Sequence, residues 1–232
     1  METSLHRQLK LFYADDDSLI EQKLGPFRID VVRGDTLIEI QHGSLSAIRD
    51  KIRKLLADYP DHQVLVVKPL IARKRLMKLK RKNARKATSR MSPKRGCILD
   101  LFDHLVYFTQ VFPHKRLAIE APLVDVEEWR YPGHGRRRRH RDNDFQIKDQ
   151  QLISVGEVHR FETAADLGQL LPEKLPQRFH TGHIAERLEI DRWVAQRMAY
   201  TLRHVGTIRQ VGKQGNAFLY ELPPAKRRRK SA

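Results

Sequence analysis

Cysteine is nearly absent from this chain, which carries a single one, Cys97, among 232 residues. One cysteine excludes an internal disulfide and a cysteine-rich zinc site. No stretch approaches the roughly 20 apolar residues that a transmembrane helix needs, and the first residues lack the apolar run of a secretory signal. We therefore expect a cytoplasmic protein of a reducing compartment, with no membrane partner.

Acidic residues are also scarce, because 28 Asp and Glu stand against 45 Lys and Arg, for a net charge of +17. Such an excess repels itself in a folded chain, so it usually has a polyanionic partner. Nucleic acid is the first candidate partner and an anionic membrane surface is the second. An apolar fraction of 40% is enough for a core and argues against wholesale disorder.

The first 70 residues show a clear succession of patterns. Apolar residues at helical spacing predict a helix over residues 3–13, with Leu5, Leu9 and Phe12 on one face. Two strands around the Gly34-Asp35 turn predict a hairpin, and Ser44 can cap the helix that follows. The predicted order is helix, three strands, helix and strand, over residues 3–13, 18–24, 27–32, 36–41, 45–56 and 63–67.

The middle part, about residues 71–160, has weaker signals. Residues 72–95 contain twelve Lys or Arg and no acid. Residues 97–110 predict an amphipathic helix with Cys97 buried at its start, and residues 117–129 and 151–161 predict strands. A basic loop lies between those strands and contains Arg136, Arg137, Arg138 and Arg139.

Helical periodicity returns from residue 162. We expect a short helix, a second helix capped by Thr181, a third capped by Asp191 and ending at Gly206, and two short strands. Helix, turn, helix and β-hairpin form the winged-helix pattern. The predicted domains are residues 1–160, with a core motif in 1–67 and a basic extension in 71–160, then residues 162–222, then a disordered basic tail, 223–232.

Strand alternation predicts a site on the hairpin. Asp30 alternates with Ile29 and Val31, while Glu39 and Gln41 alternate with Ile38 and Ile40. If both strands turn their more apolar faces to one core, then Asp30, Glu39 and Gln41 share the opposite face. Two carboxylates there would suit Mg²⁺ or Mn²⁺, which can activate water for attack on a phosphodiester.

This arrangement resembles the PD-(D/E)XK nucleases, which include restriction endonucleases and Holliday-junction resolvases. The likeness covers residues 1–67 and rests on the order of elements and on Asp30, eight intervening residues, then Glu39-Ile40-Gln41. The resemblance implies that Asp30, Glu39 and the carbonyl of Ile40 bind the metal. It also implies a carboxylate on the first helix, for which Glu2 is the candidate and Glu21 a weaker one.

Gln41 departs from the family, which usually has lysine at that position. Lysine adds a positive charge that orients water and stabilises the transition state, whereas a neutral amide adds none. Lys51 on the second helix could supply the charge, and His6 on the first helix is another contributor. The alternative is an inactive nuclease fold that binds DNA for regulation or recognition.

The predicted third helix of the winged-helix unit would enter the major groove of DNA. Val194, Met198, Thr201, Leu202 and Val205 can form its core face. The residues left outward, together with one on the predicted wing, are the expected DNA contacts: Arg192, Gln196, Arg197, Tyr200, Arg203 and Lys213. The alternative for this unit is a protein-interaction or purely structural role.

We therefore expect an α/β (α+β) protein in which a restriction-endonuclease-like mixed sheet flanked by helices precedes a small winged-helix domain. The whole layout resembles a bacterial family that joins a nuclease-like N-terminus to a DNA-binding module. The expected function is metal-dependent DNA cleavage at Asp30, Glu39 and Gln41 with Mg²⁺ or Mn²⁺. Nucleic acid is the expected partner, with DNA favoured over RNA because no aromatic-rich sheet face for base stacking is evident. A homodimer is a further expectation.

Overall fold

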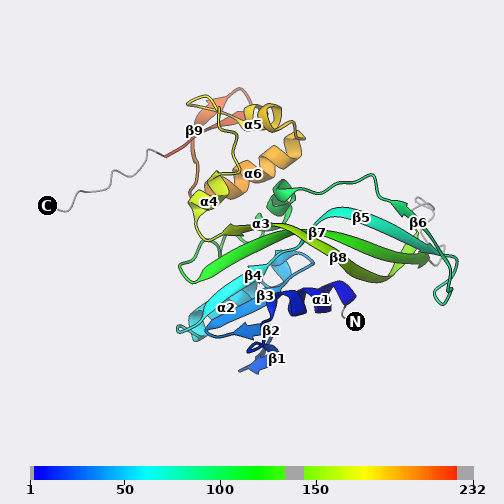
Figure 1. Cartoon of the computed structure of the whole chain (residues 1–232). Coiled ribbons are helices and arrows are strands. Elements are labelled where there is room, and N and C mark those ends of the chain that lie inside the picture. The colour runs from blue at the N-terminus through cyan, green and yellow to red at the C-terminus, as the bar shows by residue number, and fades with distance from the viewer. Residues whose placement is uncertain (1–2, 134–143, 224–232) are drawn as a thin grey trace.

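A computed structural model describes residues 3–133 and 144–223 of the chain. A large sheet with helices on both faces is followed by a small helical unit with a β-hairpin (Figure 1). The strands are β1 Leu19–Leu24, β2 Phe27–Arg33, β3 Thr36–Ile40, β4 Gln63–Val67, β5 Leu70–Leu79, β6 Ala87–Met91, β7 Leu117–Pro132, β8 Phe145–Phe161, β9 Arg209–Gln214 and β10 Ala217–Glu221. The α-helices are α1 Ser4–Tyr13, α2 Arg49–Asp58, α3 Phe102–Leu105, α4 Ala164–Gly168, α5 Thr181–Leu188 and α6 Arg192–His204, with 3₁₀ turns η1 Leu45–Ala47 and η2 Ile98–Leu101.

The large sheet has the order β1-β2-β3-β4-β7-β5-β6, and β8 also pairs with β7. Its central pairs, β3–β4, β4–β7 and β5–β7, are parallel, whereas the outer pairs are antiparallel. Strand β4 is buried on both faces, as its apolar run predicts, because Val64 and Val66 enter one core and Leu65 and Val67 the other. A mixed sheet flanked by helices confirms the predicted α+β class.

Helix α1 covers one face of the sheet. It buries Leu5, Leu9 and Tyr13, four residues apart, against the core that holds Val31 and Ile38, while Phe12 is exposed. The first turn of α1 contacts β8, because the Ser4 hydroxyl donates to the carboxylate of Asp149 at 2.6 Å. These two residues lie near opposite ends of the large unit in the sequence. These contacts fix the position of α1, and therefore of His6, over the ends of β2 and β3.

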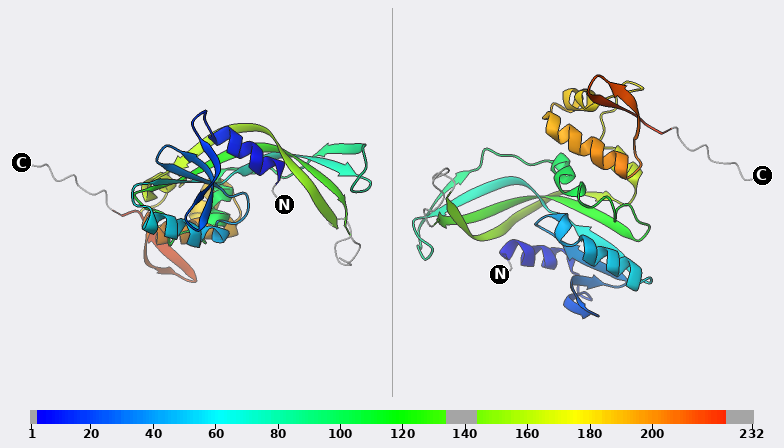
Figure 2. Two further views of the ribbon diagram at one scale, coloured as in Figure 1. Left: turned by 90° about the horizontal axis from the view of Figure 1, so that it is seen from below. Right: turned by 180° about the vertical axis from the view of Figure 1, so that it is seen from behind.

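The opposite face is covered by α2, by α3 and by the C-terminal unit (Figure 2). Ile52, Leu55 and Leu56 of α2 enter the same core as Phe102 of α3. This core continues into the C-terminal helices through residues such as Met198. The small unit therefore packs on the large unit mainly through α3, on the side away from α1.

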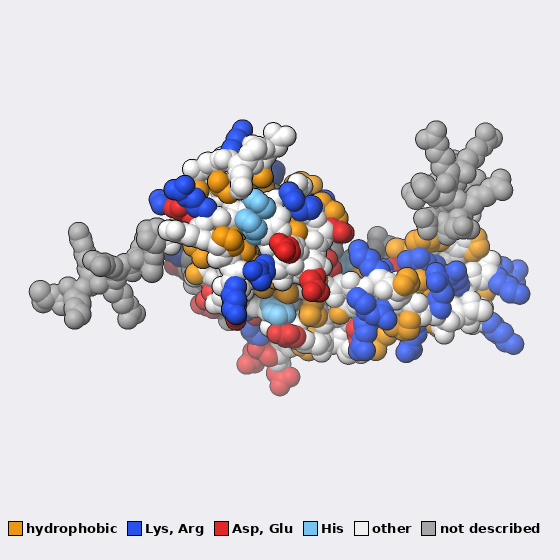
Figure 3. Space-filling view, turned by 90° about the horizontal axis from the view of Figure 1, so that it is seen from above, with side chains coloured by type: hydrophobic (Ala, Val, Ile, Leu, Met, Phe, Trp, Pro, Cys, Tyr) orange, Lys and Arg blue, Asp and Glu red, His pale blue; other side chains and the backbone are white. Residues whose placement is uncertain are grey.

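The basic segment that gave no clear pattern forms two strands, β5 and β6. Arg73, Lys74 and Arg75 of β5 pair with Asp125, Glu128 and Glu127 of the neighbouring β7. The parallel register of β5 on β7 brings these charges together across more than fifty residues of sequence. Lys and Arg side chains gather over this extended end of the sheet (Figure 3).

The C-terminal unit has the predicted order of helix, turn, helix and hairpin. The core face of α6 is confirmed, since Met198, Thr201 and Leu202 are fully buried. Phe179 pairs with Tyr220 of β10 through two backbone hydrogen bonds of 2.7 and 2.9 Å, which attach the hairpin to the segment before α5. Gly206 has a φ of +85°, as expected where a helix ends in a glycine.

Four local predictions are wrong. Phe12 is exposed, and Tyr13 takes its expected place on the buried face of α1. Residues 97–110 form the 3₁₀ turn η2 and the one-turn α3 rather than one amphipathic helix, because turns succeed each other from Val106. Cys97 is exposed rather than buried. His180, and not Thr181, is the N-cap of α5, and its side chain accepts from the N–H of Gly182. Residues 223–232, predicted as a tail, lie outside the described ranges except for Pro223.

Candidate functional site

Asp30 lies where β2 and β3 separate. The last backbone pair between these strands toward the site is Val31 with Ile38, and beyond it the strands no longer form a ladder. The carboxylate of Asp30 takes the place of a backbone partner, because its Oδ2 accepts from the Ile40 N–H at 2.8 Å. The side chain is thus held between the strands rather than on a flat sheet face.

His6 of α1 contacts both Asp30 and Ile40. Its Nε2 lies 3.3 Å from Asp30 Oδ2 and 3.0 Å from the carbonyl oxygen of Ile40. A single ring nitrogen therefore meets the two oxygens that the nuclease resemblance assigns to a metal. Burial raises the pKa of Asp30, but the hydrogen bonds from His6 and the Ile40 N–H outweigh it and hold the pKa below its ordinary value.

Glu39 of β3 is buried, with only 4% of the residue exposed. It alternates with Ile38 and Ile40, which belong to the α1 core, and its Oε1 accepts from Lys51 of α2 at 2.5 Å. Burial raises the pKa of Glu39 to about 7, although the Lys51 ammonium opposes that rise. The structure thus brings the predicted basic residue of the second helix to the predicted carboxylate.

A cleft of about 560 Å³ next to these residues contains part of the predicted site. Asp30, Ile40 and Gln41 line it together with His6, whereas Glu39 does not. Asp30 still raises the pKa of Glu39, so the two carboxylates interact electrostatically. Asp30 and Gln41 thus line the same cleft, whereas Glu39 contacts Lys51 of α2, which covers the other face of the sheet.

The remaining residues predicted around this site have other contacts. The Gln41 side chain donates to the carbonyl of Ser44 at 2.9 Å, so it is held by its own loop. Glu21 lines the cleft and pairs with Lys10 at 2.5 Å and with Arg28. Glu2 lies outside the described residues.

These residues meet the needs of Mg²⁺ only in part. Asp30 Oδ2 and the Ile40 carbonyl are hard oxygen donors of the right kind, and they converge. They converge on the His6 nitrogen, however, and Glu39 is held by Lys51. Among residues 3–133 and 144–223, no group of three or more His, Cys, Asp or Glu could hold a metal ion. In this arrangement the described residues do not fit a Mg²⁺ site, and the metal stays a prediction.

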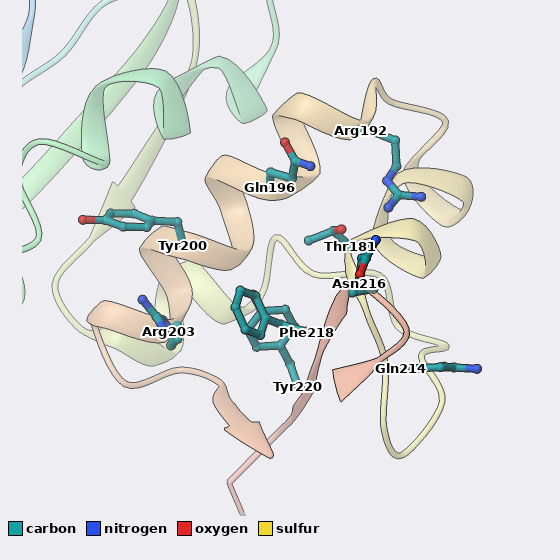
Figure 4. Close-up of a pocket in the computed structure, with 10 residues that line it drawn as sticks. Thr181, Arg192, Gln196, Tyr200, Arg203, Gln214, Asn216, Phe218 and Tyr220 are labelled. Atoms are coloured by element: carbon teal, nitrogen blue, oxygen red, sulfur yellow. The ribbon is translucent and has the colours of Figure 1, made fainter. Parts of the chain in front are cut away.

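A second cleft, of about 610 Å³, lies between α6 and the β9–β10 hairpin (Figure 4). The outward row of α6 borders it, as Arg192, Gln196, Tyr200 and Arg203 are among its lining residues. The hairpin contributes amide and aromatic side chains, and none of the lining residues is acidic. The lining from the hairpin consists of Gln214, Asn216, Ala217, Phe218 and Tyr220.

The other predicted DNA contacts lie elsewhere. Arg197 pairs with Asp103 of α3 at 2.5 Å and lies over the ring of Trp193, so it joins α6 to the large sheet unit. Lys213 lies 5.0 Å from the centre of the Phe218 ring. Arg136, Arg137, Arg138 and Arg139 lie outside the described residues.

The sequence pattern did not reveal a third group of polar residues, beside the C-terminal ends of β3 and β4. It contains Lys68, which follows the apolar run of β4 directly and is 2% exposed. Glu128 of β7 is also buried and accepts from Lys74 and Gln150, both at 2.7 Å. The available signal was a lysine next to a strand buried on both faces, because such a position is seldom exposed.

Comparison with known proteins gives a family and one relative. A family model described as "Domain of unknown function (DUF8091)" matches residues 3–162, which end where β8 ends. A Treponema pallidum (strain Nichols) protein named "Uncharacterized protein" is 29% identical over 186 residues, which cover 80% of this chain and 72% of the relative. No solved structure matches the chain. Within the described ranges, no helix is both long and apolar enough to cross a membrane.

Proposed function

The chain belongs to the DUF8091 family, and we propose that it binds duplex DNA through the cleft between α6 and the β9–β10 hairpin. The observation that carries this proposal is the cleft lining, in which two arginines and three side-chain amides occur without a carboxylate. Arginine and amide side chains donate to both phosphates and base edges. A helix of this unit type enters the major groove while the hairpin reaches the flanking backbone.

Exposed aromatic side chains support a contact surface here. Tyr200 of α6 is 43% exposed and Phe218 of β10 is 42% exposed. Figure 4 shows Phe218 between α6 and the hairpin, while Gln196 and Tyr200 point away from the strands. Such aromatic rings can pack on thymine methyl groups.

The basic end of the large sheet would add affinity that does not depend on sequence. Of the twelve cations in residues 72–95, Arg73, Lys74 and Arg75 are paired with acids of β7. Lys78, Arg90 and others of this segment are exposed. Each phosphate that such a cation neutralises steepens the salt dependence of binding by about 0.9.

Fluorescence anisotropy with labelled duplex DNA tests the proposal. Arg192→Ala and Arg203→Ala should each weaken binding by about tenfold, because a hydrogen bond to a charged group contributes about 1.5–3 kcal/mol. Arg187→Ala is the matched control, because Arg187 lies on α5 and does not line the cleft. Equal effects of all three variants, or no binding by the parent chain, would refute the proposal.

A second candidate function is hydrolysis of DNA at Asp30 and Glu39. The contact that favours it is the 2.5 Å hydrogen bond from Lys51 to Glu39, because Lys51 brings the positive charge that Gln41 lacks. Mg²⁺ or Mn²⁺ is the cofactor that this function would need, and the described residues fit it only if His6 leaves the oxygens of Asp30 and Ile40. Lys51, held at Glu39, would orient the attacking water.

Cleavage of linear, circular, single-stranded and branched DNA in Mg²⁺ or Mn²⁺ tests this second function. Asp30→Asn and Lys51→Met should abolish cleavage but leave duplex binding intact, since neither residue lines the α6 cleft. Lys54→Met, an exposed change on the same helix as Lys51, is the control. Cleavage that persists in both site variants would exclude this site, while the DNA-binding proposal would stand.

A cytoplasmic location and a homodimer complete the proposal. The one cysteine, Cys97, is exposed and free, a state that a reducing compartment maintains. Sedimentation of the purified chain with and without DNA would decide between a monomer and a dimer.

A further inference from the structure

A third cavity, of about 350 Å³, lies beside the C-terminal ends of β3 and β4. Its lining is rich in positive charge and includes two histidines. The charged lining residues are the cations Lys68, Lys74, Lys94 and Arg130 and the acids Asp100 and Asp103. His42 borders both this cavity and the cleft next to Asp30, so the two spaces adjoin.

Lys68 is a buried ammonium whose hydrogen-bond partners are two backbone carbonyls. Its Nζ donates to the carbonyl oxygens of His42 at 2.5 Å and of Gly43 at 2.9 Å. A lysine has three N–H donors, and the described residues form no ion pair with this one. Burial lowers the pKa of Lys68 to about 8, so it remains mostly charged at neutral pH. A buried cation without a counter-ion is costly.

The acids near the cavity are already engaged by other groups. Asp103 pairs with Arg197 at 2.5 Å, and Asp100 accepts from the N–H of Cys97 at 3.2 Å. Behind the lining, Glu128 pairs with Lys74 at 2.7 Å and with Arg130. Neither Lys68 nor Lys94 is among the paired cations of the described residues.

The two histidines of the lining are kept neutral by burial first and by the neighbouring positive charge second. Burial, and after it the charge of Lys68, together lower the pKa of His42 to about 4. The same two causes, burial first, lower the pKa of His104 to about 4. Both rings are therefore neutral at pH 7 and can donate a hydrogen bond to an anion without adding charge.

We propose that this cavity binds a phosphate group, held by Lys68 at its base and Lys94 at its rim. A dianion with several acceptor oxygens matches clustered ammonium donors and ring N–H groups better than a carboxylate does. The place also fits, because ligands of sheets with parallel strands bind beyond the carboxyl ends of those strands. The phosphate can come from a 5′-phosphorylated DNA end or from a small phosphorylated molecule. This site does not depend on the α6 cleft or on cleavage at Asp30.

Calorimetric titration of the full chain with inorganic phosphate tests the site. Lys68→Met should weaken phosphate binding by at least about tenfold, since a hydrogen bond to a charged group is worth about 1.5–3 kcal/mol. Lys94→Gln should also weaken it and lies on an exposed loop, so it remains informative if Lys68→Met unfolds. Lys78→Met is the matched control, because it removes the same charge from an exposed position on β5. No phosphate binding at millimolar concentration, or equal binding by Lys94→Gln and the parent chain, would overturn the proposal.

The source of the phosphate is tested with one duplex made with and without a 5′-phosphate. A DNA end as ligand predicts tighter binding of the phosphorylated duplex, and Lys94→Gln should abolish that preference. Equal binding of the two duplexes, together with measurable inorganic phosphate binding, assigns the site to a small phosphorylated molecule. In both arms, the Arg203→Ala variant should keep its phosphate affinity, which separates this site from the α6 cleft.

Discussion

Replacing Glu39 with glutamine should remove a pH dependence from the stability of this chain. An unfolded glutamate titrates near its ordinary value of 4.5, whereas burial raises the pKa of Glu39 in the folded chain to about 7. Below pH 4.5 the carboxyl is protonated in both states, so its burial costs no ionisation energy. Between pH 4.5 and about 7, the Glu39 carboxyl is ionised in the unfolded chain but still protonated in the folded chain. The free energy of unfolding therefore falls as the pH rises.

The magnitude follows from the difference between these two pKa values. Each pKa unit of difference corresponds to about 1.4 kcal/mol, so the difference between the folded and unfolded values corresponds to about 3 kcal/mol. The amide introduced by Glu39→Gln does not titrate, and its carbonyl can still accept the hydrogen bond from Lys51. The stability of the parent chain relative to Glu39→Gln should therefore fall by about 3 kcal/mol from pH 4.5 to 7 and then level off.

Urea denaturation followed by circular dichroism, with EDTA present, measures this difference at each pH. Most other titrations cancel between the two proteins, because distant sites contribute additively. Lys51→Met is a useful companion, since loss of the ammonium should raise the pKa of Glu39 and move the fall to higher pH. If the difference in unfolding free energy between the two proteins stays constant or rises with pH, then burial does not raise the pKa of Glu39.

Three further outcomes can be checked with the same assays. Arg197→Ala should lower the free energy of unfolding by no more than about 1 kcal/mol, because its pair with Asp103 is partly exposed, and it should change DNA affinity less than Arg203→Ala does. Glu128→Gln should cost about 3 kcal/mol at pH 7, since it leaves two cations without their buried carboxylate, and the cost should shrink in acid because the pKa of Glu128 is held below its ordinary value. Arg203→Gln should make the plot of log affinity against log salt shallower by about 0.9, and an unchanged slope would exclude a phosphate contact.

Local patterns predicted most of the elements, because each depends on neighbours in the sequence. The apolar period of residues 3–13, the Gly34 turn and the run before Lys68 all identify their elements correctly. The basic segment gave no clear prediction for the opposite reason. Strand β5 pairs its cations with acids of β7 more than fifty residues away, and nothing within residues 72–95 indicates that partner.

The same distinction applies to the candidate sites. The outward row of α6 follows from helical periodicity alone, and four of its five predicted contacts line the cleft. Arg197 departs because α3 packs beside α6 and offers Asp103, a contact that depends on the tertiary fold. The Lys68 cavity is lined by residues from several segments that are far apart in the sequence. Only the lysine directly after β4 could have indicated it from the sequence.

Asp30 shows why alternation alone misjudges a site at the end of a hairpin. Alternation assumes a continuous ladder, in which every second residue shares a face. Here the ladder ends at Val31, and the Asp30 carboxylate accepts the backbone N–H of Ile40 that a further strand residue would have bonded. This places Asp30 beside the Ile40 carbonyl, where His6 meets both oxygens, and leaves Glu39 with Lys51. Each carboxylate therefore has its own basic partner, and any cation at Asp30 must compete with His6 for the same two oxygens.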